Sequence, residues 1–193
     1  MQRLVATLLM LTPFLSACEL RQAAGAGAAA ATVSRCLPGE RGYLRMSLRG
    51  AINAEIDARG STLGCEGGER PDGRGLRLSF AVPALAGVPA LRIVFGLDAA
   101  PRRNAAGPLP TNLTLIAEGK QRLYATQGEE HCSIEGLDQQ AVGTAGEYRV
   151  AARGSCIDPA TTLDGAERLY VNRFDFAGLA SFAPEEPGHV AAN

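Results

Sequence analysis

Five cysteines carry the most reactive side chains of this 193-residue chain, at positions 18, 36, 65, 132 and 156. A cysteine can form a disulfide, bind zinc or carry a lipid. No two of the five show the close C-x₂₋₄-C spacing of structural zinc sites, so the spacing disfavours zinc. An odd number of cysteines leaves at least one outside any set of intramolecular disulfides. We therefore expect one cysteine to have a separate role.

Residues for acid–base or nucleophilic catalysis are few and poorly grouped. The chain has two histidines, and His189 lies close to the C-terminus. His131 follows Glu129 and Glu130, which would allow a carboxylate–imidazole pair, but a single histidine at the start of a strand is more often a polar edge residue. The G-x-S-x-G, S-x-x-K, H-E-x-x-H and G-K-[ST] motifs are absent from the sequence. We predict no catalytic residue, no metal site and no cofactor, and leave open whether the protein is an enzyme.

The N-terminal residues have the composition of a secretory signal. Arg3 precedes an apolar core that begins with residues 4–11, and the segment ends in Leu15-Ser16-Ala17-Cys18. This ending resembles the lipobox of bacterial lipoproteins, and the resemblance covers only the N-terminal segment. It implies that residues 1–17 are a signal peptide and that the mature chain begins at Cys18. In that class the cysteine carries a thioether-linked diacylglycerol and an acylated amine, and several acyl chains exceed what stable anchoring requires.

The same resemblance sets the expected location. The apolar run is shorter than the roughly 20 residues that span a bilayer, so lipid on Cys18 would be the only membrane attachment. A buried core helix is the alternative, but the N-terminal position, the flanking Arg3 and the lack of acidic residues favour a signal. An Asp after the lipidated cysteine favours the inner membrane in enteric lipoproteins, and this chain has Glu19 there. We expect a lipid-anchored protein of the bacterial cell envelope, at the outer membrane and facing the periplasm.

Lipidation of Cys18 would leave four cysteines, and export to an oxidising compartment favours two disulfides. Suppose that residues 131–136 and 147–156 pair antiparallel, with Cys132 opposite Cys156. The turn then falls at Thr144, within a turn-like stretch, and both cysteines share one face of the hairpin. We therefore predict a Cys132–Cys156 disulfide. Pairing of the remaining two, Cys36 and Cys65, is predicted by elimination.

From Tyr43 onward the hydrophobic pattern has a period of two, which is typical of strands with one buried face. The alternation over 43–59 fits one strand or two joined at Arg49-Gly50, and its unbroken phase favours a single strand bent at Gly50. Further strands are expected at 76–82, 91–95, 112–117, 122–126, 131–136, 147–156 and 169–176. Helical turns would fit only at 83–86 and 159–163, and the glycine-rich stretch 67–75 is expected to be a surface loop. We predict an all-β fold, a single antiparallel β-sandwich with two disulfides, with a small β-barrel as the alternative.

The segments on either side of these strands have little apolar surface to bury. Residues 18–35, rich in alanine and glycine, are expected to be a tether between the lipidated cysteine and the domain. Residues 183–193 are expected to be a disordered tail. The β domain would then span residues 36–182.

Two segments are candidates for a binding surface. Residues 98–111 hold Arg102, Arg103 and Asn104 between two strong strands, and long loops on β scaffolds often carry binding function, although a solvated insertion is commoner. In the last strand, four residues of shared phase would form either an aromatic recognition stripe or a core-facing edge: Tyr170, Asn172, Phe174 and Phe176.

Composition narrows the function. The chain has 19 basic residues, or 18 once Arg3 is removed, against 20 acidic ones, and this balance without basic clusters argues against nucleic acid as a partner. Our leading hypothesis is a membrane-anchored, non-enzymatic envelope lipoprotein with a binding or structural role and an envelope protein as its partner. The second is a lipid or small-molecule carrier with a lipocalin-like barrel, which would need a continuous apolar cavity. The third is an envelope hydrolase, which would need His131 or a carboxylate pair in a concave pocket.

Overall fold

The computed structural model describes residues 36–38, 41–128 and 131–183. The predicted signal peptide, Cys18, the tether through residue 35 and the tail from residue 184 lie outside the described residues. Glu129, Glu130 and His189 also lie outside them.

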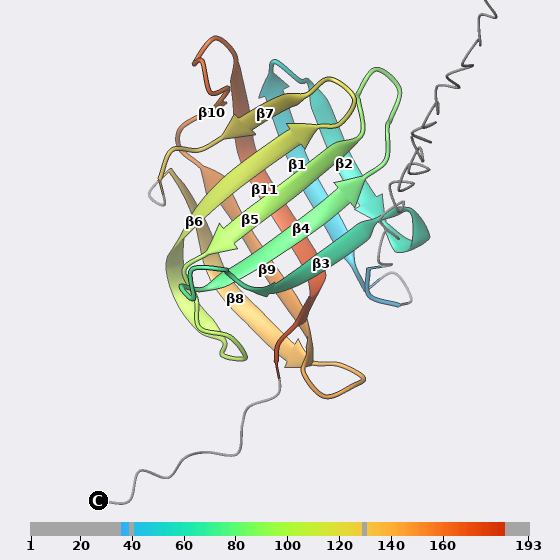
Figure 1. The fold of residues 1–193 in the computed structure, drawn as a ribbon, viewed down its shortest axis with the longest axis vertical. Helices are drawn as coiled ribbons and strands as arrows, with labels where there is room; N and C mark the ends of the chain where they lie inside the picture. Colours follow the sequence, from blue (N-terminus) through green and yellow to red (C-terminus); the bar gives the residue numbers. More distant parts are fainter. Residues whose placement is uncertain (1–35, 39–40, 129–130, 184–193) are drawn as a thin grey trace, which may run out of the picture. The chain divides into compact units, whose positions relative to one another are not determined.

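The described chain is almost entirely antiparallel β-sheet, as predicted, and Figure 1 shows its strands in two layers. One layer, which we call the β5 layer, contains β3 (Gly64–Glu69), β4 (Leu76–Val82), β5 (Leu91–Leu97), β6 (Ala105–Ala117) and β7 (Arg122–Ala125). The other, the β11 layer, contains in spatial order β2 (Ala54–Arg59), β1 (Tyr43–Gly50), β11 (Arg168–Ser181), β9 (Glu147–Cys156) and β8 (Cys132–Ala141).

The two layers belong to a single 11-stranded sheet that folds over on itself. The first half of β6 pairs with β8, and the short strand β10 (Ala160–Thr161) bridges β7 and β11. Within the described residues, the one helical element is the 3₁₀ turn Gly60–Thr62. The helical turns considered at 83–86 and 159–163 are absent, because the first segment enters a tight turn closed by Leu85 and Val88 and the second contains β10.

Four phenylalanine rings occupy the centre between the layers. Phe80 and Phe95 come from β4 and β5, Phe174 and Phe176 come from β11, and all four are buried. The ring centroid of Phe95 lies 4.6 Å from that of Phe176 and 4.9 Å from that of Phe174. Inward-facing aliphatic side chains of the long strands surround these rings. Burial of this apolar surface is the main force that holds the two layers together.

Residues 43–59 form a hairpin, so the prediction of a single bent strand was wrong. β1 and β2 pair antiparallel, with Leu48 opposite Ala54. Asn53 closes the turn, since its side-chain oxygen accepts a hydrogen bond from the Gly50 N–H and its amide donates to the Gly50 carbonyl. Even-numbered residues lie opposite even-numbered ones across this turn, so the alternation of apolar and polar residues continues from β1 into β2 without a shift. Alternation alone could not reveal the reversal.

The stretch 67–75 is only partly the surface loop that we expected, because Gly67 and Gly68 belong to β3. β3 runs close beside the end of β11. A Cβ on Gly67 would lie 3.0 Å from the Leu179 carbonyl oxygen, and one on Gly68 would lie 2.9 Å from that of Ser181. The glycines therefore permit a close approach of two backbones, which a loop interpretation of glycine-rich sequence overlooks.

β11 changes its buried face halfway along its length. Ser47 lies opposite Arg173 but Leu48 lies opposite Val171, so Asn172 is the extra residue of a β-bulge. Tyr170 is consequently exposed on one side of the bulge, whereas Phe174 and Phe176 are buried on the other. The aromatic stripe on a shared phase does not form, because the extra residue shifts the phase by one.

Both predicted disulfides are present. Cys132 pairs with Cys156 across β8 and β9 in the expected register, and Cys36 bonds to Cys65. The β8–β9 register then shifts at a bulge between Ile134 and Leu137, and β8 continues to Ala141, five residues beyond the expected end at 136.

Candidate functional site

Five charged side chains of alternating sign cross the outer face of the β11 layer. Strand register places Asp57 of β2 opposite Arg45 of β1, Arg45 opposite Asp175 of β11, and Asp175 opposite Arg153 of β9. The row ends on β8 with Glu135, whose Oε2 lies 2.6 Å from Arg153 Nε. Arg45 lies 3.7 Å from the carboxylates of both Asp57 and Asp175. We call this row the charge ladder.

The charge ladder crosses a groove of about 490 Å³ on this face of the sheet. We call it the outer groove and define it by its polar lining: Arg45, Ser47, Glu55, Asp57, Glu135, Arg153, Arg173 and Asp175. A neighbouring hollow of about 380 Å³ shares Glu135, Arg153 and Asp175 with it and reaches Tyr43. Together the two hollows are lined by residues from all five strands of this layer.

Gly154 allows the strands beneath the groove to approach closely. It lies opposite Phe174 of β11 on one side and opposite Ile134 of β8 on the other. A Cβ at this position would lie 2.1 Å from the Ser133 carbonyl oxygen and 2.8 Å from the Phe174 ring. No side chain fits at position 154. Gly154 therefore lines the outer groove, and any other residue there would disturb the core beneath it.

Two carboxylates of the outer groove, Glu55 and Asp57, are stabilised in their charged form. Hydrogen bonds from Ser47 and Arg49 lower the pKa of Glu55 below its usual value, and hydrogen bonds from Arg59 lower that of Asp57. The Tyr43 hydroxyl donates to Asp175 at 2.8 Å, and burial together with this hydrogen bond raises the pKa of Tyr43. Four carboxylates and three guanidinium groups line the groove, so it presents both charges to a ligand at neutral pH.

Arg173 differs from the other two arginines of the outer groove. Arg45 and Arg153 form ion pairs within the charge ladder, whereas the exposed Arg173 has no hydrogen bond or ion pair with any residue that the structure describes. It lies directly opposite Ser47, one residue beyond the bulge. Its charge contributes to the lowered pKa of Glu55, but without a direct ion pair its guanidinium is available to an acidic group of a ligand or partner.

The loop residues that the sequence singled out have structural contacts. β6 begins at Ala105, so the expected loop 98–111 shortens to 98–104. Asn104 Oδ1 accepts the backbone N–H of Gln139, and Gln139 Oε1 accepts the N–H of Arg102 at 2.9 Å. The Arg102 guanidinium lies over the Phe182 ring, 5.2 Å from its centroid, and donates to the Ala183 carbonyl. Arg103 is exposed and makes no side-chain hydrogen bond or ion pair with a described residue.

His131 pairs with a carboxylate that the sequence did not suggest. Its Nδ1 lies 2.6 Å from Asp158 Oδ2, while the expected partners, Glu129 and Glu130, lie outside the described residues. The pair is partly exposed and lies apart from the lining of the outer groove. Among the residues that the structure covers, no three of His, Cys, Asp and Glu are grouped in a way that could hold a metal ion.

The sequence pattern predicted that the polar residues of 43–59 face solvent, but it did not identify the outer groove. The signal was present in Arg45, Ser47, Glu55 and Asp57, which alternate with the buried positions. What brings Asp175 and Arg153 beside them is the order β2-β1-β11-β9, in which β11 and β9 are far from β1 in sequence.

Comparison with known protein families found no match for this chain, and comparisons with curated proteins and with solved structures found none. The part of the chain that the structure describes has no helix of the length and apolar character needed to cross a membrane.

Proposed function

We propose that this chain is a bacterial envelope lipoprotein, anchored through lipid on Cys18, whose β domain binds a protein partner through the outer groove. The observation that carries the binding role is the groove itself, with its paired charges and one unpaired guanidinium on Arg173. The anchor rests on the lipobox-like sequence at residues 15–18. We expect the lipid to hold the domain at the outer membrane, facing the periplasm.

Binding accounts for the outer groove better than hydrolysis does. A carboxyl group that acts as a general acid needs a raised pKa, so that it holds a proton near neutral pH. The surroundings of Glu55 and Asp57 lower their pKa values instead. Charged groups of both signs on one surface favour partner specificity and correct orientation, because a mismatched charge is costly.

The carrier hypothesis has no comparable support. A lipocalin-like carrier needs an apolar chamber between its layers, and the rings of Phe80, Phe95, Phe174 and Phe176 pack against one another in that space. The outer groove is lined by charged side chains together with Met46, Ile56 and Phe174, so it does not supply an apolar chamber either.

Site-specific photo-crosslinking in living cells tests the proposal on the lipidated full-length protein. The variant Arg173→p-benzoylphenylalanine places the reactive group in the outer groove. Arg103→p-benzoylphenylalanine places it on the 98–104 loop, and Arg77→p-benzoylphenylalanine on β4 in the other layer. Arg173 and Arg103 are exposed, and Arg77 is partly exposed and pairs with Glu66, so the three variants place the same group at the surface of different parts of the domain.

We expect one discrete adduct from position 173 and none from position 77. An adduct from position 103 alone would reject the outer groove and make the 98–104 loop the binding surface. Absence of an adduct from position 173 in correctly processed protein would also reject the proposal. A separate measurement of lipid labelling tests the anchor, so the two parts can fail independently.

A further inference from the structure

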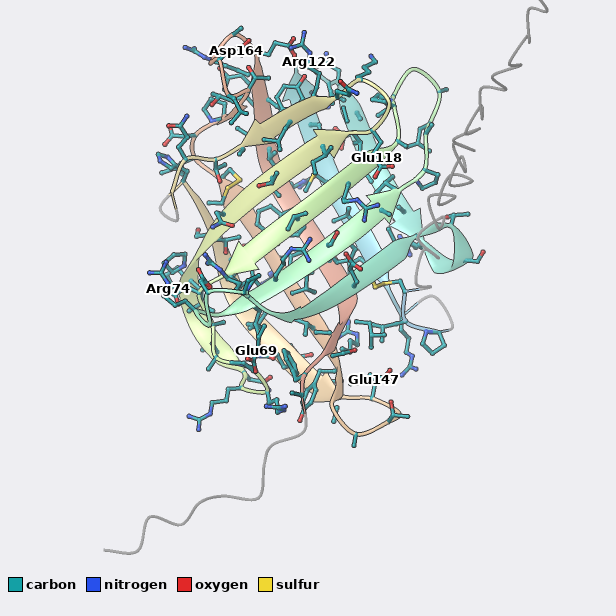
Figure 2. The ribbon with its side chains drawn as sticks, in the orientation of Figure 1. Glu69, Arg74, Glu118, Arg122, Glu147 and Asp164 are labelled. Atoms are coloured by element: carbon teal, nitrogen blue, oxygen red, sulfur yellow. A yellow bond between two sulfur atoms is a disulfide. The ribbon has the colours of Figure 1, made fainter. Side chains whose placement is uncertain are left out.

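A second cavity lies at the end of the domain where the β1–β2 and β6–β7 turns lie. Its volume of about 410 Å³ falls within the range of about 300–1,000 Å³ typical of small-molecule sites. Figure 2 shows Arg122, one of its lining residues, at the end of the molecule opposite Glu147. Ile52 connects β1 to β2 while Lys120 and Arg122 belong to the β6–β7 hairpin, so both layers contribute to this cavity. We call it the end pocket.

The end pocket has an apolar wall. Half of its lining residues are apolar, and they come from three separate parts of the chain: Ala51 and Ile52, Pro89, and Ala117. Such a wall gains free energy when an apolar body displaces water from it.

Glu167 already has two partners inside the end pocket. The Tyr124 hydroxyl donates to Glu167 Oε2 at 2.5 Å, and Arg122 Nη2 lies 3.4 Å from Glu167 Oε1. Burial and the neighbouring Glu167 raise the pKa of Tyr124 to about 12, so its hydroxyl keeps its proton and its bond to Glu167 at neutral pH. The charges of Arg122 and Glu167 therefore compensate each other.

Lys120 supplies the remaining charge of the end pocket. Its ammonium group makes no hydrogen bond or ion pair with any described residue. It is also the only lysine among the 19 basic residues of the chain. An ammonium group is a compact point charge with three donors, which can bind an anionic group without the planar geometry that arginine requires.

We infer that the end pocket binds a small organic acid, with its apolar body against Ile52 and Pro89 and its anionic group on Lys120. This inference does not depend on the outer groove, because the two sites share no lining residue and lie on different parts of the domain.

Two probes of nearly equal size and shape test the inference: 2-naphthoate, which carries a carboxylate, and naphthalene-2-carboxamide, which is neutral. The sample is ¹⁵N-labelled unlipidated protein from Glu19 to Asn193, which keeps every described residue and both disulfides. Amide shifts in two-dimensional NMR spectra report both the affinity and the position of binding. Lys120→Gln removes the charge, Lys120→Arg keeps it, and Arg103→Gln removes a charge from an exposed loop elsewhere.

We expect saturable shifts at Ile52, Ala117 and Arg122, and 2-naphthoate to bind about tenfold more tightly than the carboxamide, as one charge-assisted hydrogen bond predicts. Lys120→Gln should remove this difference, while Lys120→Arg and Arg103→Gln should preserve it. The inference is wrong if 2-naphthoate causes no saturable shifts at the end pocket. It is also wrong if Lys120→Gln binds both probes as the unmodified protein does.

Discussion

The side-chain oxygen of Gln139 accepts a hydrogen bond from the backbone N–H of Arg102, 2.9 Å away, and this bond joins β8 to the loop between β5 and β6. The amide nitrogen of the same side chain donates to the carbonyls of Ala100 and Arg103. Gln139 is 6% exposed, so its side-chain amide has little access to water. Arg102 takes a φ of 59°, in the left-handed region that is unusual for a residue with a side chain. Gln139 therefore holds the 98–104 loop in a conformation that the loop sequence alone does not favour.

Gln139→Ala should lower the free energy of unfolding by about 1–3 kcal/mol, because it removes three part-buried hydrogen bonds to the backbone of the loop. Urea denaturation measures this change. The adjacent Gln140→Ala is the matched control. Gln140 is exposed and its side-chain amide donates one exposed hydrogen bond to Asp138, so the change in stability should be less than about 0.5 kcal/mol. Equal stability of the two variants would show that Gln139 does not hold the loop.

Gly154→Ala should destabilise the β11 layer by about 3 kcal/mol, because the new methyl group would meet the Ser133 carbonyl and the Phe174 ring. Thermal or urea unfolding gives the magnitude. Gly136→Ala is the comparison, since its nearest atom, the Ala105 carbonyl oxygen, would lie 3.2 Å from the new Cβ. A fully stable Gly154→Ala protein would contradict the close packing of β8, β9 and β11 at this point.

Tyr124→Phe should change how stability depends on alkaline pH. The pKa of Tyr124 is raised to about 12 in the folded protein, above the value of about 10 expected when unfolded. A raised pKa contributes stability that is complete below pH 10 and is lost as pH rises from there through 12. The unfolding free energy of the unmodified protein should therefore fall more steeply above pH 10 than that of Tyr124→Phe. Parallel pH profiles would show that the hydroxyl does not titrate in this way.

Cys18→Ala should abolish incorporation of labelled fatty acid and leave an unprocessed precursor that retains residues 1–17. Metabolic labelling followed by mass spectrometry of the N-terminus measures both effects. Cys132→Ala is not expected to affect lipid labelling, because Cys132 forms a disulfide within the β domain. Normal processing of Cys18→Ala would remove the basis for the lipid anchor.

Local patterns predicted several of the strands and one disulfide, but missed β3 and β10. The alternation at 76–82 and the apolar run at 91–95 match β4 and β5, and the register that places Cys132 opposite Cys156 follows from one turn. Each of these inferences depends on residues close together in sequence. The boundaries of β6 and β11 were missed where Pro-rich or small residues continue a strand, as at 105–111 and 177–181.

The outer groove could not be predicted in the same way. Arg45 and Asp57 share a hairpin, but Arg153 and Asp175 come from strands that join them only in the folded sheet. The bulge at Asn172 adds a second difficulty. The side of the sheet on which Arg173 lies depends on this one-residue insertion, which has no signature in the polarity pattern. The long-range strand order and this local irregularity together determine which charges meet.

The bulge at Asn172 also limits how this sequence can change in length. Before it, odd-numbered residues such as Leu169 and Val171 are buried, and after it even-numbered residues such as Phe174 and Phe176 are buried. Deleting or inserting one residue near this point would exchange the solvent-exposed and buried faces of half of β11. Arg173 would then lie towards the core and the phenylalanines at the surface. Related sequences should therefore differ in this segment by substitution, while gains and losses of single residues should fall in the turns.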